Sequence, residues 1–257
     1  LLVGALVVGT AFPHLLKGYS FGFSWQYVIV FISFLAIIGG LLMLSFVPNG
    51  PYRKASQKLK LNAWLKNFKD TKFRSAAFGY FGHMWELYAF WAFVPVILSL
   101  YKENNLESTL NIPLWSFIII GVGGLSCVIG GYLSSIFKIK KVAFTALLLS
   151  CLCCLISPFI LLTNSEFILL SFLVFWGMVV IADSPLFSTL VAQNAIPKYK
   201  GTALTIVNCI GFAITIISIQ LLNYLHLKYN SSFLYMILAI GPILGLIALS
   251  RKPITHD

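Results

Sequence analysis

Charged side chains are scarce in this sequence, where Asp, Glu, Lys and Arg together make up only 10% of 257 residues. A soluble domain usually carries about 25%. The mean hydropathy is +0.92, so most of the protein surface must meet something other than water. The net charge of +11 would suggest a nucleic-acid partner in a soluble chain. Here the basic residues are better explained as loop residues beside a membrane, and we expect no nucleic acid.

The sequence also lacks the motifs of common enzymes. It contains no HExxH zinc motif, no GxSxG elbow and no phosphate-binding GxxxxGK[ST] loop. Its cysteines all lie inside apolar runs, where a disulfide framework is not expected and free thiols behave as small hydrophobic groups. A metal site at the cluster around Cys151 is the alternative. We expect no enzymatic activity, no cofactor and no metal. The cysteines are Cys127, Cys151, Cys153, Cys154 and Cys209.

Long apolar runs, by contrast, fill almost the whole chain. A spanning helix needs about 20 apolar residues, and backbone groups in hydrocarbon must be paired within the structure. The runs are continuous rather than alternating, which favours helices over a barrel. The sequence therefore predicts an all-α membrane protein with about eight transmembrane helices. The segments are residues 1–16, 25–47, 75–100, 114–137, 142–163, 166–190, 202–224 and 232–250.

Basic residues are distributed unequally between the loops on the two sides of these eight segments. One side carries 15 of the 18 Lys and Arg residues, and the other carries only Lys17, Lys102 and Lys228. Because successive loops alternate between the two sides, an incorrect number of spans would assign basic loops to both sides and remove this asymmetry. The side rich in basic residues, with the C-terminal tail at 251–257, is expected to be cytoplasmic. We expect an integral protein of a bacterial or archaeal plasma membrane.

The connection at residues 48–74 is the longest and divides the chain into two spans at 1–47 and six spans at 75–250. Within it, apolar residues recur at helical spacing with lysines on the other faces. This pattern is typical of a basic amphipathic helix at the membrane interface. A partner-binding helix of the kind that calmodulin recognises is the alternative. The apolar positions are Leu61, Trp64, Leu65 and Phe68.

Three stretches of sequence resemble one family of transporters. They are GGYLSSIFKIKKV at 130–142, IPKYKGTALTIVNCIGF at 196–212, and ALVVGTAFPHLL at 5–16 with WQYVIVFISFLAIIGGLL at 25–42. Their order and the long basic loop are similar to the major facilitator superfamily. In the first stretch Gly131 matches the glycine of that family's gating loop, and Lys140 and Lys141 match its basic pair. Ser135 stands where the family has an acid, so this position lacks the negative charge of the family's gating loop.

The resemblance implies that the chain corresponds to helices five to twelve of a twelve-helix transporter. The six-helix C-terminal half would then be complete. The preceding N-terminal helices of the same chain would be missing partners of this half. The family moves small solutes by alternating access. The first span lacks the Gly-Pro…Gly-Gly signature of the family's drug antiporters, which argues against drug efflux.

One predicted span carries a carboxylate near mid-depth, where charged groups are costly and usually functional. Glu86 lies about twelve residues into the 75–100 segment. His83 and Tyr80 precede it at intervals of three residues, so all three share a helical face. We expect Glu86 and His83 to form a pair that handles a proton or a substrate. A hydrogen-bonded pair that ties this helix to a neighbour is the structural alternative.

A second carboxylate, Asp183, lies deep in the 166–190 segment, directly before Ser184 and Pro185. The proline removes a backbone donor and is expected to break the helix. Broken helices near the midplane are common at transporter binding sites. Asp183 and Ser184 are therefore candidates for the substrate or proton pathway. The alternative is that the Asp183 carboxylate caps amides freed at the break.

Asn208 completes the candidate pathway residues, from a lightly polar face of the 202–224 segment. Such residues also serve as interhelical hydrogen bonds, and that interpretation is the stronger one for Asn208. From these residues we expect a secondary transporter of a small polar or anionic solute, coupled to protons. The alternative is a non-transporting membrane protein, such as a sensor or an inactive relative.

Overall fold

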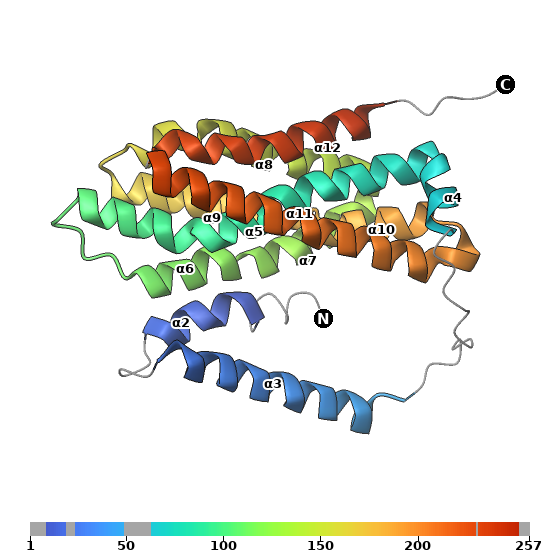
Figure 1. Ribbon diagram of the computed structural model, residues 1–257, viewed down its shortest axis with the longest axis horizontal. Helices are drawn as coiled ribbons and strands as arrows, with labels where there is room; N and C mark the ends of the chain where they lie inside the picture. Colours follow the sequence, from blue (N-terminus) through green and yellow to red (C-terminus); the bar gives the residue numbers. More distant parts are fainter. Residues whose placement is uncertain (1–8, 19–23, 49–62, 230, 252–257) are drawn as a thin grey trace.

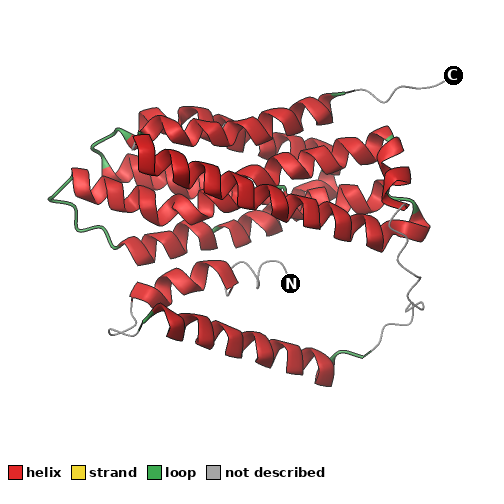
Figure 2. Cartoon of the chain, in the orientation of Figure 1, coloured by secondary structure: helices red, strands yellow, loops and turns green. Residues whose placement is uncertain are grey.

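The computed structural model describes residues 9–18, 24–48, 63–229 and 231–251. These residues form helices joined by short turns, with no β-strand among them (Figure 2). The long helices run side by side, with α2 and α3 along one edge (Figure 1). The α-helices are Phe12–Gly18 (α2), Trp25–Phe46 (α3), Ala63–Lys69 (α4), Thr71–Asn104 (α5), Ile112–Gly121 (α6), Gly123–Ile136 (α7), Ile139–Leu161 (α8), Glu166–Ala182 (α9), Ser184–Asn194 (α10), Lys200–Tyr229 (α11) and Ile240–Ser250 (α12). Short 3-10 helices occupy Pro197–Tyr199 (η2) and Ser232–Ala239 (η3).

The all-α membrane architecture predicted from sequence is confirmed. Seven segments within the described residues are helical, long and apolar enough to cross a bilayer. They coincide with the second to eighth predicted segments. Half of the first predicted segment, residues 1–8 of 1–16, lies outside the described residues. The span predicted at 75–100 is longer than expected, because Asp70 caps the start of α5 by accepting from the amides of Lys72 and Phe73.

Three of the spans are not continuous α-helices. The span Ile112–Ile136 is interrupted at Val122, between α6 and α7. The span Glu166–Asn194 is interrupted at Asp183, where the Ser-Pro sequence predicts a break. The last span begins as the 3-10 helix η3 and continues as α12. Each break changes the direction of side chains part-way across the bundle.

The central helix of the bundle is α5, and its closest contact is with α12. A side chain added at Gly82 would collide with the carbonyl oxygen of Gly241, and one added at Gly241 would collide with Gly82. Lipid tails are as apolar as leucine, so helices in a bilayer associate through close packing rather than through apolar burial. The absent side chains of these two glycines therefore allow the helix pair to form.

Buried apolar side chains form two clusters along the bundle. In the first, the C-terminal half of α5 meets α6, α9 and η3, and the rings of Phe90 and Trp176 are 4.5 Å apart. In the second, the N-terminal half of α5 meets α10, the start of α8 and the end of α12, around Phe187. On α5 the buried residues His83 and Glu86 lie where one cluster gives way to the other. Polar groups at this junction are enclosed by apolar side chains from both directions.

The predicted amphipathic helix of the 48–74 connection is described only from residue 63 onwards, as α4. Lys66 and Lys69 are exposed on it. Asn67 is buried, and its side-chain oxygen accepts a hydrogen bond from the amide of Ile196 at 2.8 Å. This bond fixes α4 to the turn between α10 and η2. The helix α3, in contrast, contributes no buried residue within the described structure.

Replacing Gly82 by Val is expected to destabilise the bundle, because the new side chain must push α5 and α12 apart. The cost of such overpacking is about 3 kcal/mol. Thermal unfolding in detergent micelles measures it as a lower melting temperature. The matched control is Gly131→Val, since an added side chain at Gly131 meets no atom within 4 Å. Equal melting temperatures for the two variants would contradict the role of the glycine contact.

Candidate functional site

Glu86 lies near the middle of the 34-residue helix α5 and has no exposed surface. Its Oε1 accepts a hydrogen bond of 2.7 Å from Nε1–H of Trp176 on α9. Its Oε2 lies 2.8 Å from the hydroxyl of Ser150 on α8, and the Cys154 thiol lies against the same carboxyl group. One carboxyl group therefore joins α5 to both α8 and α9 in the interior of the bundle.

The Ser150 hydroxyl is placed to serve either protonation state of Glu86. It lies 2.8 Å from Oε2 of Glu86 and 3.3 Å from the carbonyl oxygen of Leu147. A hydroxyl can both donate and accept. With the carboxylate ionised, Ser150 donates to Oε2. With the carboxyl protonated, Oε2–H donates to Ser150, and the hydroxyl proton turns to Leu147. The site can therefore gain or lose a proton without leaving a polar atom unpaired.

His83 and Asp183 form a second buried pair, which joins α5 to the break between α9 and α10. The Nδ1 atom of His83 lies 2.8 Å from Oδ1 of Asp183, and the two side chains are 0% and 1% exposed. The contact is an ion-pair distance, but the N–H is not aligned as in a good hydrogen bond. Nε2 of His83 and Oδ2 of Asp183 have no hydrogen-bond partner within the described residues. The pair thus retains one free donor or acceptor on each side chain.

The carbonyl group that loses its helical donor at the Asp183 break finds other donors. Pro185 cannot donate to the carbonyl oxygen of Ile181, which instead accepts from the amide of Asp183 and from the Cys127 thiol at 3.8 Å. The Asp183 side chain makes no capping hydrogen bond to α10. The alternative that this carboxylate caps freed amides is therefore not what the structure shows. The carboxylate is instead directed at His83.

The expected pairing of His83 with Glu86 was wrong. The two residues are neighbours on α5, but each is bound to a different helix. His83 contacts Asp183, with the rings of Tyr80 and Phe187 about 6 Å away from its own. Tyr80 therefore lies beside His83, as its spacing predicts. Whether these groups carry protons or substrate stays a prediction.

The sequence did not single out the two main partners of Glu86. Trp176 is a tryptophan inside an apolar run, which is typical of packing. Ser150 precedes the cluster Cys151, Cys153 and Cys154 and has no motif around it. The only available signal was that two other polar groups, one on each neighbouring span, lie at mid-depth where Glu86 needs partners.

The remaining pathway candidates, Ser184 and Asn208, differ in their position relative to this buried site. Ser184 follows Asp183 at the start of α10 and is half-buried. Asn208 is exposed on α11, on the outside of the described bundle. The structure thus brings His83 and Asp183 together with Tyr80 and Ser184 beside them, and it leaves Asn208 outside.

The predicted gating loop is exposed at the end of the bundle where α7 leads into α8. Gly131 and Ser135 are both exposed, and the Ser135 hydroxyl donates to the carbonyl oxygen of Tyr132 in its own helix. Lys140 and Lys141 are exposed on adjacent positions of α8. They line different cavities, so the structure does not bring the basic pair together.

Lys140 lines a basin of about 660 Å³ at the end of the bundle where α5 begins and α12 ends. We call this the basic basin. Five of its lining residues are basic. They lie on α5, on α8, just before α8 and just after α12. No carboxylate lines the basin. Such a concentration of one sign of charge raises the local concentration of anions. The basic residues are Lys72, Arg74, Lys138, Lys140 and Arg251.

His83→Leu is expected to destabilise the protein by about 3 kcal/mol, because it leaves the Asp183 carboxylate buried without its partner. The double variant His83→Leu/Asp183→Leu should lose less than the sum of the two single variants. Thermal unfolding of the four proteins in micelles provides this double-mutant cycle. Asn208→Leu, at an exposed position, serves as the control and should change stability by less than about 0.5 kcal/mol. Additive losses would contradict direct coupling of the pair.

Comparison with known families bears on this bundle as a whole. The pattern that defines the Major Facilitator Superfamily matches residues 1–219. No protein of established function matches the sequence significantly. The matched region covers most of the chain, and the described part of it forms the membrane-spanning helices that the resemblance implies. The chain is therefore an integral membrane protein and belongs to the Major Facilitator Superfamily of secondary transporters.

Proposed function

We propose that this protein moves a small polar or anionic solute across the plasma membrane by alternating access, coupled to protons. The observation that carries the proposal is the Glu86 carboxyl group. It is fully buried at mid-depth and is held by Trp176 and Ser150. Ionisable residues at this depth are rare and usually mark ion or proton pathways.

The proton step follows from the two partners of Glu86. Trp176 donates to Oε1 in either state, while Ser150 exchanges the roles of donor and acceptor at Oε2. Protonation therefore changes the charge of the site without breaking its hydrogen bonds. A change in charge at a fixed geometry alters how strongly the buried site favours one conformation over another.

The conformational step is assigned to the break between α9 and α10. The contact between His83 and Asp183 holds α5 against this break. A rotation of α10 relative to α9 would separate the two side chains and expose the atoms that lack partners. Discontinuous helices are the moving or binding elements in many transporters. Ser184, next to Asp183, would then join the pathway.

The preference for an anionic solute rests on the basic basin. An anion approaching this end of the bundle meets five cations and no carboxylate among the lining residues. We place this end, with the C-terminus, on the cytoplasmic side of a bacterial or archaeal membrane. Of the 18 Lys and Arg residues, the opposite side carries only Lys17, Lys102 and Lys228, which agrees with the excess of basic residues on cytoplasmic loops.

The second candidate is a non-transporting membrane protein. It is favoured by one observation, namely that both oxygens of Glu86 are already bonded within the bundle, as expected for a structural group. In that case Glu86 would keep one protonation state at all accessible pH values. The two candidates therefore differ in whether Glu86 exchanges a proton.

Glu86→Gln is expected to abolish proton exchange at this site, because an amide cannot titrate. The measurement is an infrared difference spectrum between acidic and alkaline buffer, recorded on the protein in lipid bilayers. The wild type should show the high-frequency carbonyl stretch of a protonated carboxyl group shielded from water, and Glu86→Gln should lose this band while keeping the bands of the exposed carboxyl groups. The matched control is Glu166→Gln, which removes a carboxylate at the start of α9, where it contacts Ser108.

Transport itself is tested with the same variants in vesicles loaded with a pH-sensitive dye. Inorganic phosphate and small carboxylates are added outside, with an imposed proton gradient. Wild-type protein and Glu166→Gln should accumulate at least one anion uphill, and Glu86→Gln should not. Wild-type accumulation by Glu86→Gln would exclude the proton role. Absence of flux in every protein, with no titrating carboxyl band, would favour the non-transporting alternative.

A further inference from the structure

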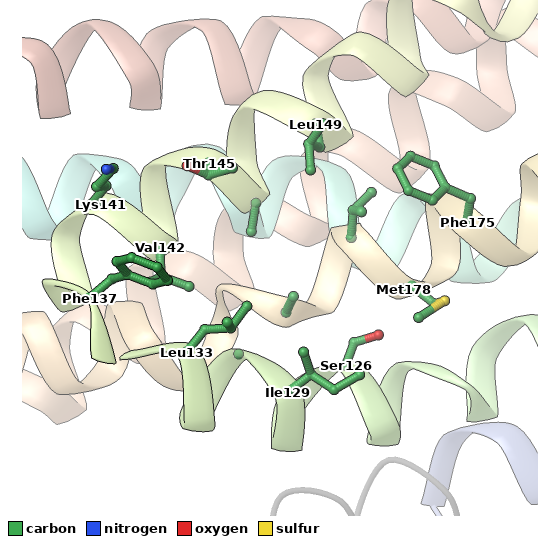
Figure 3. A pocket seen from close by; sticks show the side chains of 14 residues that line it. Ser126, Ile129, Leu133, Phe137, Lys141, Val142, Thr145, Leu149, Phe175 and Met178 are labelled. Carbon is green, nitrogen blue, oxygen red and sulfur yellow. The ribbon is translucent and has the colours of Figure 1, made fainter. Parts of the chain in front are cut away.

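A groove separate from the buried site runs between α7, α8 and α9 (Figure 3). It encloses about 360 Å³ and is lined by fourteen residues, of which only Ser126, Thr145 and Lys141 carry polar side-chain atoms. Ile129 and Phe175, which line it, are each almost half exposed. The groove therefore opens on the membrane-facing surface of the bundle. We call it the lateral groove.

Small residues create this space. Gly130 approaches α9 so closely that an added side chain would lie 2.8 Å from the carbonyl oxygen of Ala182. Ala146 and Ala182 also line the groove. Three neighbouring helices thus present little side-chain volume at one level, and the larger residues around them form the walls. The volume falls in the range of ligand pockets, which is about 300–1,000 Å³.

Of the three polar groups of the lateral groove, Lys141 and Ser126 lie toward its two ends, and Thr145 lies one turn of α8 from Lys141. Lys141, in the first turn of α8, lies at one end beside Phe137, with its ammonium 5.7 Å from the centre of the ring. Ser126 lies toward the other end (Figure 3). Its hydroxyl is buried and has no hydrogen-bond partner within the described residues. The residue before α8, Lys138, makes no side-chain cap, so the first amides of this helix add positive potential near Lys141.

The length of the groove matches one leaflet of a bilayer. Lys141 and Leu149 both line it and are eight residues apart on α8, which corresponds to about 12 Å. The hydrocarbon of one leaflet is about 15 Å thick. An elongated apolar ligand that starts at the basic end of the bundle would therefore reach the interior of the membrane along the groove.

We propose that the lateral groove binds a phospholipid with a net negative charge, from the leaflet at the basic end of the bundle. One acyl chain lies between α7, α8 and α9, and the phosphate contacts the Lys141 ammonium. The lining suits a chain of methylene groups and offers a hydrophilic solute almost nothing to bond. No carboxylate lines the groove, so the single cation favours an anionic headgroup over a zwitterionic one. This site does not depend on the proposed transport.

The test uses protein reconstituted in vesicles of equal parts phosphatidylglycerol and phosphatidylcholine, then extracted in mild detergent. Native mass spectrometry counts the lipids that remain bound. The wild type is expected to retain one phosphatidylglycerol in preference to phosphatidylcholine. Ile129→Trp, which fills the mouth of the groove, should lose it. Lys141→Gln should keep a lipid but lower the preference for phosphatidylglycerol about fivefold, the effect of one charge at an anionic surface.

Two matched controls separate the groove from its surroundings. Val128→Trp places the same side chain at an exposed position next to Ile129 that does not line the groove. Lys140→Gln removes a charge next to Lys141 that lines the basic basin. Both controls should behave as the wild type. If Ile129→Trp fails to fold, Thr145→Trp fills the groove from α8, at an exposed position.

Three results would overturn the proposal. Equal lipid retention by the wild type and a folded groove-filling variant would show that lipid does not occupy the groove. Equal loss of preference in Lys140→Gln and Lys141→Gln would show diffuse attraction instead of a site. A wild-type mass of two chains that Ile129→Trp converts to one chain would show that a second copy covers this face.

Discussion

The need to pair the two buried carboxyl groups, Glu86 and Asp183, within the bundle is the constraint on which the rest of this structure depends. In hydrocarbon no water is present to hydrogen-bond an unpaired carboxylate. Glu86 meets this need through Trp176 and Ser150, and Asp183 meets it in part through His83. These contacts connect α5 with α8, α9 and the start of α10 at one level. Any sliding of one helix along another would leave a carboxyl group unbonded, so the contacts fix the longitudinal register of the helices.

Close packing sets the distance between helices, while the polar contacts set their register. The pair Gly82 and Gly241 brings α5 and α12 together through their backbones. Gly130 does the same for α7 and α9 at Ala182, one residue before the break at Asp183. The break is therefore held from two sides, by backbone packing at Ala182 and by His83 at Asp183. The carbonyl group of Ile181, which Pro185 cannot bond, accepts from the Cys127 thiol and from the Asp183 amide, so this acceptor has partners in the broken conformation.

Most of the fold could be predicted from the sequence because a bilayer leaves so few choices. Apolar runs of spanning length predict helices, and for residues 24–251 the predicted segments lie within a few residues of the observed spans. The helix ends were less predictable, since caps such as Asp70 extend α5 beyond its apolar run. The break at Asp183 was predictable from Pro185. The break at Val122 was not, because no proline marks it.

The candidate site could be predicted in its members but not in its contacts. Spacing along one helix places His83 and Glu86 on a shared face, and the sequence suggests a pair. Three residues of α-helix turn by about 300°, which leaves the two side chains about 60° apart. In a crowded bundle that angle is enough to direct one to α10 and the other to α8 and α9. Which neighbour lies in each direction depends on the packing of the whole bundle, which a single sequence does not contain.

The same geometry separates two lysines that the sequence presents as one basic pair. Lys140 and Lys141 differ by about 100° around α8, and they line the basic basin and the lateral groove respectively. A count of basic residues assigns both to one side of the membrane and can say nothing more. The cavities distinguish them: the space beside several cations suits a soluble anion, and the apolar space beside a single cation suits a lipid. A helix at the membrane surface has one side toward the aqueous end of the protein and another toward the bilayer. Adjacent charges on one helix turn can therefore contact water on one side and lipid on the other.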